Sequence, residues 1–312
     1  MQVKGNVLIC DPISSVGITI LKKAGLNVAN KPSISNSELL SEVEKCDVIV
    51  VRSRTKITSE IISKAKNTKI IARVGVGLDN VDIDSAKEYQ IEVVNSPESA
   101  INAVAELVIG LMLSMARSLT LADSEMKKGN WIKKELSGIE LKGKYLGIVG
   151  VGNIGRNLAR IARALRMNII GYDTYPIKRE FINEVGMITT DFNTLIASSD
   201  FISCHVPATE ETKHMFNEDA FSKMKPTAFI INASRGEIMD EKSLYNALIT
   251  KKIAGAALDV FEKEPPTNRK LIELSNVICT PHIGAQTKES QDLASNVIAE
   301  KIILKLLEKN SV

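Results

Sequence analysis

Three side chains able to bind a carboxylate or to move a proton follow apolar segments in the second half of the chain. They are Arg235 in NASRGE, Glu264 in DVFEKEPP and His282 in TPHIGAQT. A guanidinium can hold a carboxylate through paired hydrogen bonds and polarise a neighbouring oxygen, with a structural ion pair as the alternative. An imidazole exchanges protons near neutral pH. These residue types predict proton and hydride chemistry at C2 of a small 2-hydroxy or 2-oxo acid.

The acid–base histidine and its carboxylate partner each have a rival. The chain has three histidines, and His205 in CHVP and His214 compete with His282. Glu262 competes with Glu264 as the carboxylate that would hydrogen-bond the far nitrogen of the imidazole, fix its tautomer and favour its charged form. Spacing along the chain does not choose between these residues.

The sequence KYLGIVGVGNIG, at residues 144–155, is typical of a dinucleotide-binding turn. An apolar strand runs directly into the glycines, and the helical segment RNLARIARAL follows. Gly150 permits the tight turn, Gly152 lets the backbone approach a pyrophosphate, and Gly155 allows the helix to pack closely on the strand. The free N–H groups of the helix then face the phosphates. Asp173, at the end of the next strand, can accept hydrogen bonds from a ribose 2′-hydroxyl, so NAD is the predicted cofactor.

The preference for NAD over NADP has one alternative. The Asp173 carboxylate would repel the 2′-phosphate of NADP, but Lys178 and Arg179 follow closely and could tolerate it. Solvated charges on a helix surface are the simpler explanation of these two residues. NADP therefore stays open as a second cofactor.

Short apolar segments alternate with helical segments in two blocks. The first block ends near Asn95 and the second begins at Lys144. The expected strands are 7–10, 48–51, 70–74, 146–150, 169–172, 201–203, 228–232, 254–258 and the segment VICT at 277–280. Strands that alternate with helices form parallel sheets covered on both faces. We therefore predict an α/β protein with two doubly wound parallel-sheet domains.

Two further segments have the apolar spacing of helices. Residues 99–131 fit a long, mostly buried helix, whose small residues, Gly110 among them, suit close packing against another helix. This helix would lie either in a core between domains or at a subunit interface. Residues 287–307 form an amphipathic helix by spacing and could return to the first block.

Composition and charge exclude several classes of protein. With 312 residues, 44% of them hydrophobic, the chain exceeds the size of one ordinary core. Forty basic and 37 acidic residues are scattered and leave a net charge of +3, so we expect no nucleic-acid partner.

No window offers 18 uninterrupted apolar residues, and the start lacks a signal-like pattern, so we expect no membrane partner and a cytoplasmic location. Four cysteines without CxxC spacing predict buried thiols in a reducing compartment, and we expect no metal site.

The chain resembles the D-isomer-specific 2-hydroxyacid dehydrogenases over nearly its whole length. The resemblance runs in order through GVGNIGRNLA, YDTYP, FISCHVPATEETKHMF, NASRGEIMDEKSL, AGAALDVFEKEP and TPHIGAQT. It implies that Arg235 binds substrate, that His282 is the acid–base and that Glu264 supports it. It also implies cofactor contacts at Gly150, Gly152, Asn153, Ile154, Gly155, Asp173, His205, Pro207, Thr212, Ala233, Asp259 and Gly284, with Asp259 near the nicotinamide amide.

The resemblance also implies a domain organisation. Residues 1–97 and 285–312 would form a discontinuous, flavodoxin-like substrate-binding domain. Residues 98–284 would form a Rossmann-type NAD-binding domain that includes a dimerisation helix and arm. The protein would be a homodimer acting on a small-molecule substrate.

Within the family, VRSRTKIT, ARVGVGLDNVD and PESAINAVAEL are most similar to members that act on 3-phospho-D-glycerate in the first step of serine biosynthesis. The implied reaction is NAD-dependent oxidation to 3-phosphohydroxypyruvate. Arg52 or Arg54 could bind the phosphate through charge-assisted hydrogen bonds, with Arg73 adding positive charge or serving a structural pair. Backbone N–H groups of the glycine loop could take the carboxylate. The expected substrate contacts are Arg52, Ser53, Gly75, Val76, Gly77, Arg235 and His282.

Other functions stay open at this stage. A glyoxylate or hydroxypyruvate reductase, or a D-lactate-type dehydrogenase, would use the same catalytic residues. A non-catalytic NAD-sensing binding protein would be expected to lack the full set of Arg235, Glu264 and His282. The chain ends 30 residues after His282, so we expect no serine-sensing regulatory domain and no inhibition by serine of that kind.

Overall fold

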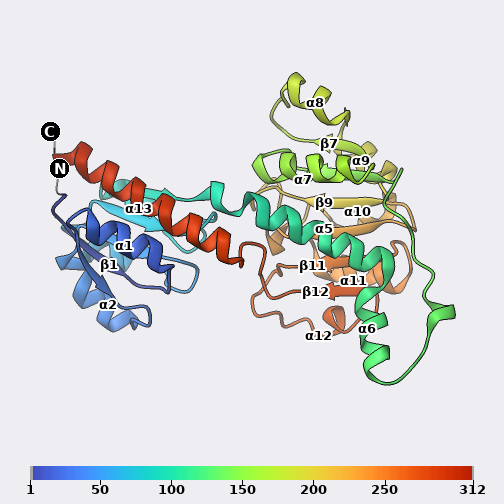
Figure 1. The fold of residues 1–312 in the computed structure, drawn as a ribbon, viewed down its shortest axis with the longest axis horizontal. Coiled ribbons are helices and arrows are strands. Elements are labelled where there is room, and N and C mark those ends of the chain that lie inside the picture. Colours follow the sequence, from blue (N-terminus) through green and yellow to red (C-terminus); the bar gives the residue numbers. More distant parts are fainter. Residues whose placement is uncertain (1–2, 311–312) are drawn as a thin grey trace. The chain divides into compact units, whose positions relative to one another are not determined.

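The computed structural model of this protein describes residues 3–310 and forms two compact units. Unit 1 consists of Met1–Ala100 together with Ala285–Val312, and unit 2 consists of Ile101–Gly284. The chain therefore leaves unit 1 once and returns to it once (Figure 1). Each unit contains one sheet whose neighbouring strands are parallel, which confirms the predicted fold class.

The sheet of unit 1 has the strand order β2-β1-β3-β4-β5. Its strands are β1 (Asn6–Ile9), β2 (Asn27–Asn30), β3 (Val48–Val51), β4 (Ile70–Arg73) and β5 (Glu92–Asn95). This is the flavodoxin-like order, and the winding direction reverses between β1 and β3. In a doubly wound sheet, ligands bind at the carboxyl ends of the strands beside such a reversal.

Helices cover both faces of this sheet. They are α1 (Ser15–Lys23), α2 (Asn36–Glu42), α3 (Ser59–Lys64), α4 (Ile83–Glu88) and α13 (Lys288–Asn310). α2, α3 and α4 share a core with one face, whereas α1 and α13 lie side by side on the other (Figure 1). Gly17 allows this close approach, because a Cβ there would lie 2.6 Å from the carbonyl oxygen of Ser295. The predicted helix at 287–307, and its return to the first block, are confirmed.

The sheet of unit 2 has the strand order β12-β11-β10-β9-β6-β7-β8. Its strands are β6 (Tyr145–Val149), β7 (Asn168–Tyr172), β8 (Met187–Thr189), β9 (Phe201–Cys204), β10 (Phe229–Asn232), β11 (Gly255–Leu258) and β12 (Val277–Cys279). The winding direction reverses between β6 and β9. The loops that follow β10, β11 and β12 are neighbours along one edge, because parallel strands end at the same side of a sheet.

The helices of unit 2 also form two layers. They are α5 (Ile101–Arg117), α6 (Leu119–Lys127), α7 (Asn153–Ala164), α8 (Arg179–Val185), α9 (Phe192–Ser198), α10 (Glu218–Lys223), α11 (Glu241–Ile249) and α12 (Arg269–Ile272). α5, α7 and α8 pack on one face of the sheet, and α9, α10 and α11 pack on the other. The burial of both faces explains the continuous apolar runs from which most of these strands were predicted.

The single long helix predicted at 99–131 is two helices. Ser118 separates α5 from α6 and has a φ of 50°, a left-handed conformation that a continuing helix does not contain. α5 packs against α7 and strands β10 and β11. Gly110 is exposed and has nothing within 4 Å of its missing Cβ, so it serves no packing within this chain, and its role at a subunit interface stays a prediction.

The α5 segment is the one described helix that is long and apolar enough to cross a membrane. Pro97–Arg117 passes that test by length and composition alone. More than half of it is buried inside the protein, at 56%. Burial against α7 and the sheet is what a core helix requires, and it accounts for the apolar character of this segment.

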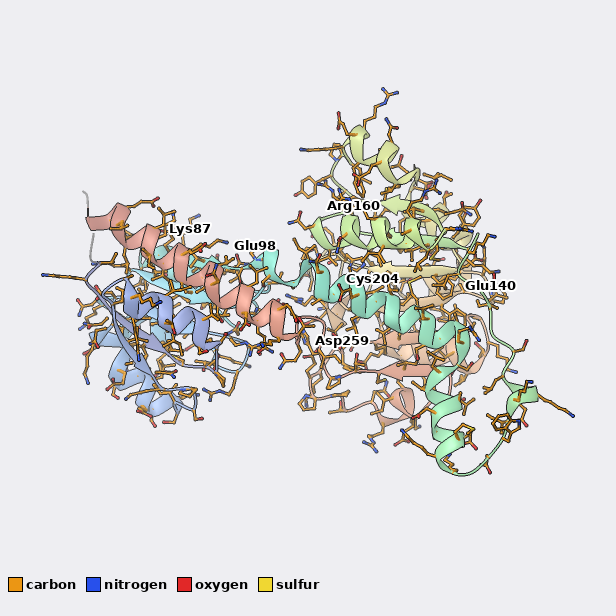
Figure 2. The ribbon with its side chains drawn as sticks, viewed as in Figure 1. Lys87, Glu98, Glu140, Arg160, Cys204 and Asp259 are labelled. Carbon is orange, nitrogen blue, oxygen red and sulfur yellow. The ribbon has the colours of Figure 1, made fainter. Side chains whose placement is uncertain are left out.

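The prediction of four buried thiols holds for three of them. Cys10, Cys46 and Cys204 are buried, the last of them inside the sheet of unit 2 (Figure 2). Cys279 is exposed, because it ends β12, an edge strand that neighbours only β11. Desolvation raises the pKa of the Cys10 thiol to about 12 and that of Cys279 to about 11, so both remain protonated near neutral pH.

Candidate active site

The three predicted catalytic residues of unit 2 all follow neighbouring strands of one sheet. Arg235 follows β10, Glu264 follows β11 and His282 follows β12, and these strands are adjacent in the order β12-β11-β10. Their loops therefore share the carboxyl edge of the sheet, where doubly wound proteins bind ligands.

A buried carboxylate fixes the loop that carries His282. Asp259 is 1% exposed and lies at the end of β11 (Figure 2). Its side chain accepts hydrogen bonds from Thr280 Oγ1 at 2.6 Å, Ile283 N at 2.8 Å and Gly284 N at 2.8 Å. Its carbonyl oxygen accepts a fourth from His282 N at 2.8 Å. A buried carboxylate must be satisfied in this way, and here the donors come from almost every residue around the histidine.

The backbone of His282 has a φ of 52°, in the left-handed region that costs a residue with a Cβ about 1 kcal/mol. Such a conformation persists only where the surroundings impose it, and the Asp259 hydrogen bonds do so. The ring itself is 52% exposed, while the backbone that carries it is held by these hydrogen bonds.

The structure pairs His282 with Glu264. Nδ1 of the ring lies 2.8 Å from Glu264 Oε2, and Glu264 Oε1 accepts a hydrogen bond from Phe261 N at 3.3 Å. The rival pair also exists: His214 Nε2 lies 3.3 Å from Glu262 Oε1. The sequence DVFEKEPP thus supplies two carboxylates to two different imidazoles, and only the one at 264 reaches the histidine that Asp259 holds.

A buried amide positions Arg235. Asn232, 1% exposed at the end of β10, donates from Nδ2 to the Arg235 carbonyl at 2.8 Å. Its Oδ1 accepts from Ser234 N and Ser234 Oγ. The next residue, Gly236, packs directly on the backbone of Phe261, because a Cβ there would lie 1.9 Å from the Phe261 carbonyl carbon. The loop bearing Arg235 is therefore in van der Waals contact with the turn bearing Glu264.

The glycine turn has the geometry that its sequence predicts. Gly150 has a φ of 94°, and a Cβ at Gly155 would lie 2.3 Å from the Gly150 carbonyl oxygen. A Cβ at Gly152 would meet nothing within 4 Å, so the backbone there is open to a ligand. No side chain caps the N-terminus of α7, whose first amides point out of this turn. These features fit a pyrophosphate, whose anionic oxygens would accept hydrogen bonds from the free N–H groups.

Asp173 is tied to the same turn. Its Oδ2 accepts from Val151 N at 2.7 Å and its Oδ1 from Tyr175 N at 2.9 Å. These bonds aim the carboxylate without using all of its lone pairs. A surface hollow of about 400 Å³ lies beside it, lined by Gly171, Asp173, Thr174, Tyr175, Pro176, Ile177, Ile182, Thr189 and Thr190. The position suits the adenosine end of a dinucleotide.

His205 follows β9, on the other side of the reversal from the glycine turn. Its backbone lies so close to Gly150 that a Cβ on the glycine would be 2.8 Å from the His205 carbonyl carbon and oxygen. Its Nε2 lies 2.9 Å from Ser203 Oγ, and desolvation lowers the pKa of its ring to about 4. A ring with so low a pKa is a weak base near pH 7, which favours His282 over His205 as the proton acceptor.

The remaining predicted cofactor residues lie in loops at this same edge. Thr212 Oγ1 donates to the Pro207 carbonyl at 2.6 Å, which shapes the loop after His205. Asn153 and Ile154 begin α7, Ala233 follows β10, and Gly284 donates to Asp259. Their roles toward a cofactor stay predictions.

In unit 1, a second buried carboxylate contacts the two candidate phosphate-binding arginines in different ways. Asp11 is 0% exposed, follows β1, and accepts from Arg52 N, Thr55 N, Thr55 Oγ1 and Arg54 Nε. The Arg54 guanidinium also donates to the carbonyls of Cys10 and Pro32. The Arg54 guanidinium is therefore engaged within the protein, which makes it the weaker of the two candidates for binding phosphate.

The Arg52 side chain is held far more loosely. Its two terminal nitrogens lie 3.4 Å from Pro12 O and from Gln286 Oε1, contacts that a phosphate would readily replace. It follows β3, beside the reversal between β1 and β3. Ser53, the neighbouring candidate, is exposed.

The glycine loop after β4 is only partly available to a substrate carboxylate. Gly75 N donates to Ser96 Oγ at 2.8 Å, and the Val76 carbonyl accepts from Asn95 Nδ2 at 2.6 Å. In this conformation the Gly75 amide is used within the protein. A carboxylate would be left with the amides of Val76 and Gly77.

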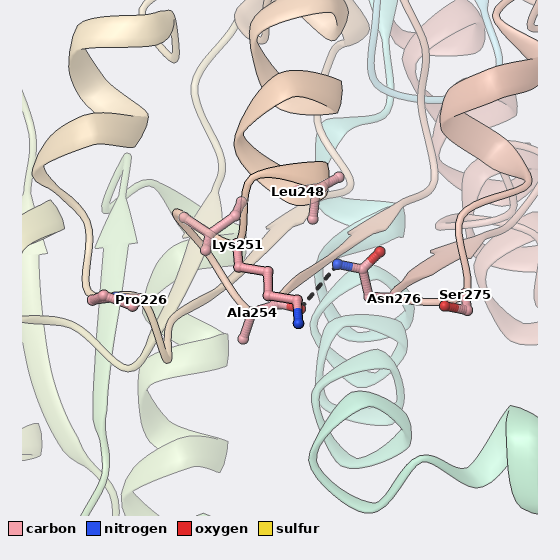
Figure 3. Close-up of a pocket in the computed structure, with 7 residues that line it drawn as sticks. Pro226, Leu248, Lys251, Ala254, Ser275 and Asn276 are labelled. Carbon is pink, nitrogen blue, oxygen red and sulfur yellow. Dashed lines mark hydrogen bonds between the residues drawn. The ribbon is translucent and has the colours of Figure 1, made fainter.

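A second hollow lies at the opposite edge of the unit 2 sheet. It measures about 430 Å³ and is lined by Pro226, Leu248, Lys251, Ile253, Ala254, Ser275 and Asn276 (Figure 3). Asn276 donates across its floor to the Ala254 carbonyl at 3.2 Å. These residues precede β10, β11 and β12, so the hollow is separated from Arg235 and His282 by the length of the strands.

Comparison with known proteins identifies the chain's relatives. Residues 109–284 match the NAD-binding domain of the D-isomer specific 2-hydroxyacid dehydrogenases. D-3-phosphoglycerate dehydrogenase of Archaeoglobus fulgidus is 46% identical over 299 residues, which make up 96% of this chain and 56% of that protein. Hydroxypyruvate reductase of Thermotoga maritima is 45% identical over 305 residues, 96% of this chain and 98% of that protein. The crystal structure of a glyoxylate reductase from Paecilomyes thermophila matches with a TM-score of 0.88 at 29% identity, over 96% of this chain and 94% of that one.

The chain belongs to the D-isomer-specific 2-hydroxyacid dehydrogenase family. Unit 2 contains the family's NAD-binding domain, and NAD is the cofactor that this domain indicates. The chain spans about half the length of the Archaeoglobus relative, at 56%. Similarity to the Thermotoga relative extends over nearly the whole of both chains.

Three residues that shape the candidate site were missed by sequence reasoning. Asn232, Asp11 and Ser96 each end or follow a strand and hold a loop through hydrogen bonds. A short polar residue directly after an apolar run is the signal that could have found the first two, since Asn and Asp often organise the following turn. Ser96 gives no such signal, because its partner Gly75 lies 21 residues earlier.

The lowered pKa of His205 predicts a measurable loss of acid stability. Unfolded histidine takes up a proton below about pH 6.5, whereas folded His205 does so only near pH 4. Stability should therefore fall as pH decreases from 6.5 to 4, by about 1 to 3 kcal/mol from this residue. We expect His205→Gln to flatten the dependence of Tm on pH in that range. Parallel Tm curves for the variant and the wild type would contradict it.

Proposed function

We propose that the protein is an NAD-dependent dehydrogenase that oxidises the C2 hydroxyl of 3-phospho-D-glycerate to 3-phosphohydroxypyruvate. The observation that carries the proposal is the 2.8 Å contact of His282 Nδ1 with Glu264 Oε2 in an NAD-binding domain. The 46% identity to a D-3-phosphoglycerate dehydrogenase supports the choice of substrate. The reaction would supply the first step of serine biosynthesis.

His282 has the contacts required of the proton acceptor. With the Nδ1 proton directed at Glu264, Nε2 carries the lone pair that takes the hydroxyl proton. The Glu264 carboxylate stabilises the imidazolium that forms and keeps the ring in this tautomer. Bound NAD supplies the acceptor for the C2 hydride. In the reverse direction His282 returns the proton to the oxygen.

Two arginines are assigned to the two anionic ends of the substrate. Arg235, held by Asn232, would bind the carboxylate and polarise the C2 oxygen. Arg52 would bind the phosphate, because its present contacts are long and its neighbour Arg54 is committed to Asp11. The amides of Val76 and Gly77 would add donors for the carboxylate.

Hydroxypyruvate reduction is the second candidate. The Thermotoga hydroxypyruvate reductase matches 98% of its own length, which the phosphoglycerate dehydrogenases do not. The same three catalytic residues would serve, and Arg52 would then have no phosphate to bind. The choice between the two substrates therefore depends on Arg52.

We also propose a cytoplasmic homodimer formed through α5 and the arm after it. Large apolar side chains are exposed there in the single chain, and they are Leu113, Leu119, Leu121, Met126 and Trp131. Exposed apolar groups gathered on one segment mark an interaction surface. Gly110, open on the same helix, would allow close approach of a second copy.

The reaction is tested by following NADH absorbance with 3-phosphoglycerate, hydroxypyruvate, glyoxylate and pyruvate, each with NAD(H) and NADP(H). We expect the largest kcat/KM for 3-phosphoglycerate with NAD. His282→Ala should lower kcat by about 10²- to 10⁴-fold, because it removes the proton acceptor, while NADH binding stays unchanged. A wild-type kcat in this variant would remove His282 from the chemistry.

Substrate choice is tested by comparing Arg52→Ala with Arg54→Ala. The first should raise KM for 3-phosphoglycerate about 10- to 100-fold through lost charge-assisted hydrogen bonds, with little effect on hydroxypyruvate. The second should lower Tm without favouring either substrate, because Arg54 pairs with the buried Asp11. If Arg52→Ala affected both substrates equally, hydroxypyruvate reductase would become the better assignment.

The assembly is tested by sedimentation velocity. We expect the wild type to sediment as a dimer and the double variant Leu119→Lys, Leu121→Lys to sediment as a monomer, because two charges would replace exposed apolar contacts. Val16→Lys, an exposed apolar position on α1, is the matched control and should remain dimeric. A monomeric wild type would refute the proposal.

A further inference from the structure

His214 has a backbone conformation that glycine would adopt more easily. Its φ is 50°, and its N–H donates to the Glu237 carbonyl at 2.8 Å. Its side chain pairs with Glu262, with Nε2 3.3 Å from Oε1. A histidine at such a position carries a backbone cost, which indicates that its side chain has a use.

Glu262 and Glu241 exchange hydrogen bonds at the start of α11, and this reciprocal pair is called the clasp below. Its Oε1 accepts from Glu241 N at 3.0 Å, and its own N–H donates to Glu241 Oε1 at 2.9 Å. Each glutamate thus satisfies a backbone amide of the other, as in a helix capping box. The His214 imidazole lies against the same carboxylate oxygen, with Nε2 3.3 Å from Oε1. The clasp fastens the segment after β11 to a helix that is itself packed on the sheet.

The clasp lies next to the acid–base pair. Glu264 is two residues beyond Glu262, and its carboxylate joins Phe261 N to His282 Nδ1. On the other side, Gly236 packs on the Phe261 backbone. A shift of residues 261–262 would therefore move Glu264 relative to the ring that Asp259 fixes.

We propose that His214 and Glu262 are positioning residues that hold Glu264 on His282. The inference rests on the proposed dehydrogenase function. Two glutamates of one short segment each contact an imidazole. The Glu264–His282 pair would transfer the proton, and the Glu262–His214 pair would keep Glu264 in position. His214 also follows the loop of Pro207 and Thr212, so this contact ties a predicted cofactor loop to the acid–base pair.

The test compares His214→Gly, Glu262→Ala and their double variant with the wild type. We expect kcat to fall about threefold to fivefold in His214→Gly, the size of effect expected when one exposed polar contact is lost, with KM values near those of the wild type. Glu262→Ala should lose about tenfold, because the Glu241 bond is lost as well. The double variant should be no worse than Glu262→Ala, since both changes break one clasp.

Two further variants separate positioning from a general structural effect. His214→Gln keeps a donor of similar reach and should restore kcat; Gln90 shows that glutamine occupies a φ of 57° in this chain. Asp219→Asn removes another exposed ion pair of unit 2, with Lys223, and should leave kcat unchanged. An increase in KM for NAD with unchanged kcat would overturn the proposal, because His214 would then serve the cofactor loop.

Amide hydrogen exchange tests the clasp independently of the reaction. The amides of Phe261 and Glu262, whose hydrogen bonds belong to this segment, should exchange several times faster in His214→Gly than in the wild type. Unchanged exchange of this segment would overturn the proposal even in an active enzyme. If the wild type lacked activity on every substrate, the proposed function would fail, while faster exchange would still support the clasp as the holder of Glu264.

Discussion

The acid–base site depends on the hydrogen bonds of one buried carboxylate. Asp259 has no access to water and receives donors from Thr280, Ile283 and Gly284. Leaving such a carboxylate unsatisfied would cost several kcal/mol, which exceeds the roughly 1 kcal/mol cost of the left-handed backbone at His282. The loop therefore adopts the strained conformation, and the imidazole is held in place before any ligand arrives.

The same device recurs at the ends of other strands. Asn232 after β10 and Asp11 after β1 are buried polar residues whose partners are the loops that follow. A parallel sheet collects these loops on one edge, so a few satisfied polar groups arrange several functional side chains at once. This explains why Arg52 and Arg54, two residues apart, are held differently. The Asp11 carboxylate accepts a hydrogen bond from the Arg54 guanidinium, whereas the Arg52 guanidinium makes only long contacts.

Contact between loops is as important as the loops themselves. Gly236 has no room for a Cβ against the Phe261 backbone, so the arginine loop and the Glu264 turn can only move together. The reciprocal bonds of Glu241 and Glu262 then fasten this turn to α11. The glycine after Arg235 is required by packing, whereas a Cβ at Gly152 of the dinucleotide turn would meet nothing in the protein and could be excluded only by a bound ligand.

The sequence by itself determined the two doubly wound sheets, the glycine turn with its Asp173, and the residue types of the acid–base site. It could do so because buried parallel strands leave continuous apolar runs and because a turn at Gly150 requires glycine locally. It did not find β2, β5 or β8, which are edge strands and so lack such runs. Only the tertiary structure decided that Glu264 meets His282 while Glu262 meets His214, that Arg54 is engaged, and that Gly75 donates to Ser96. Those outcomes depend on contacts between segments far apart in the chain, where spacing along the sequence carries no information about distance in space.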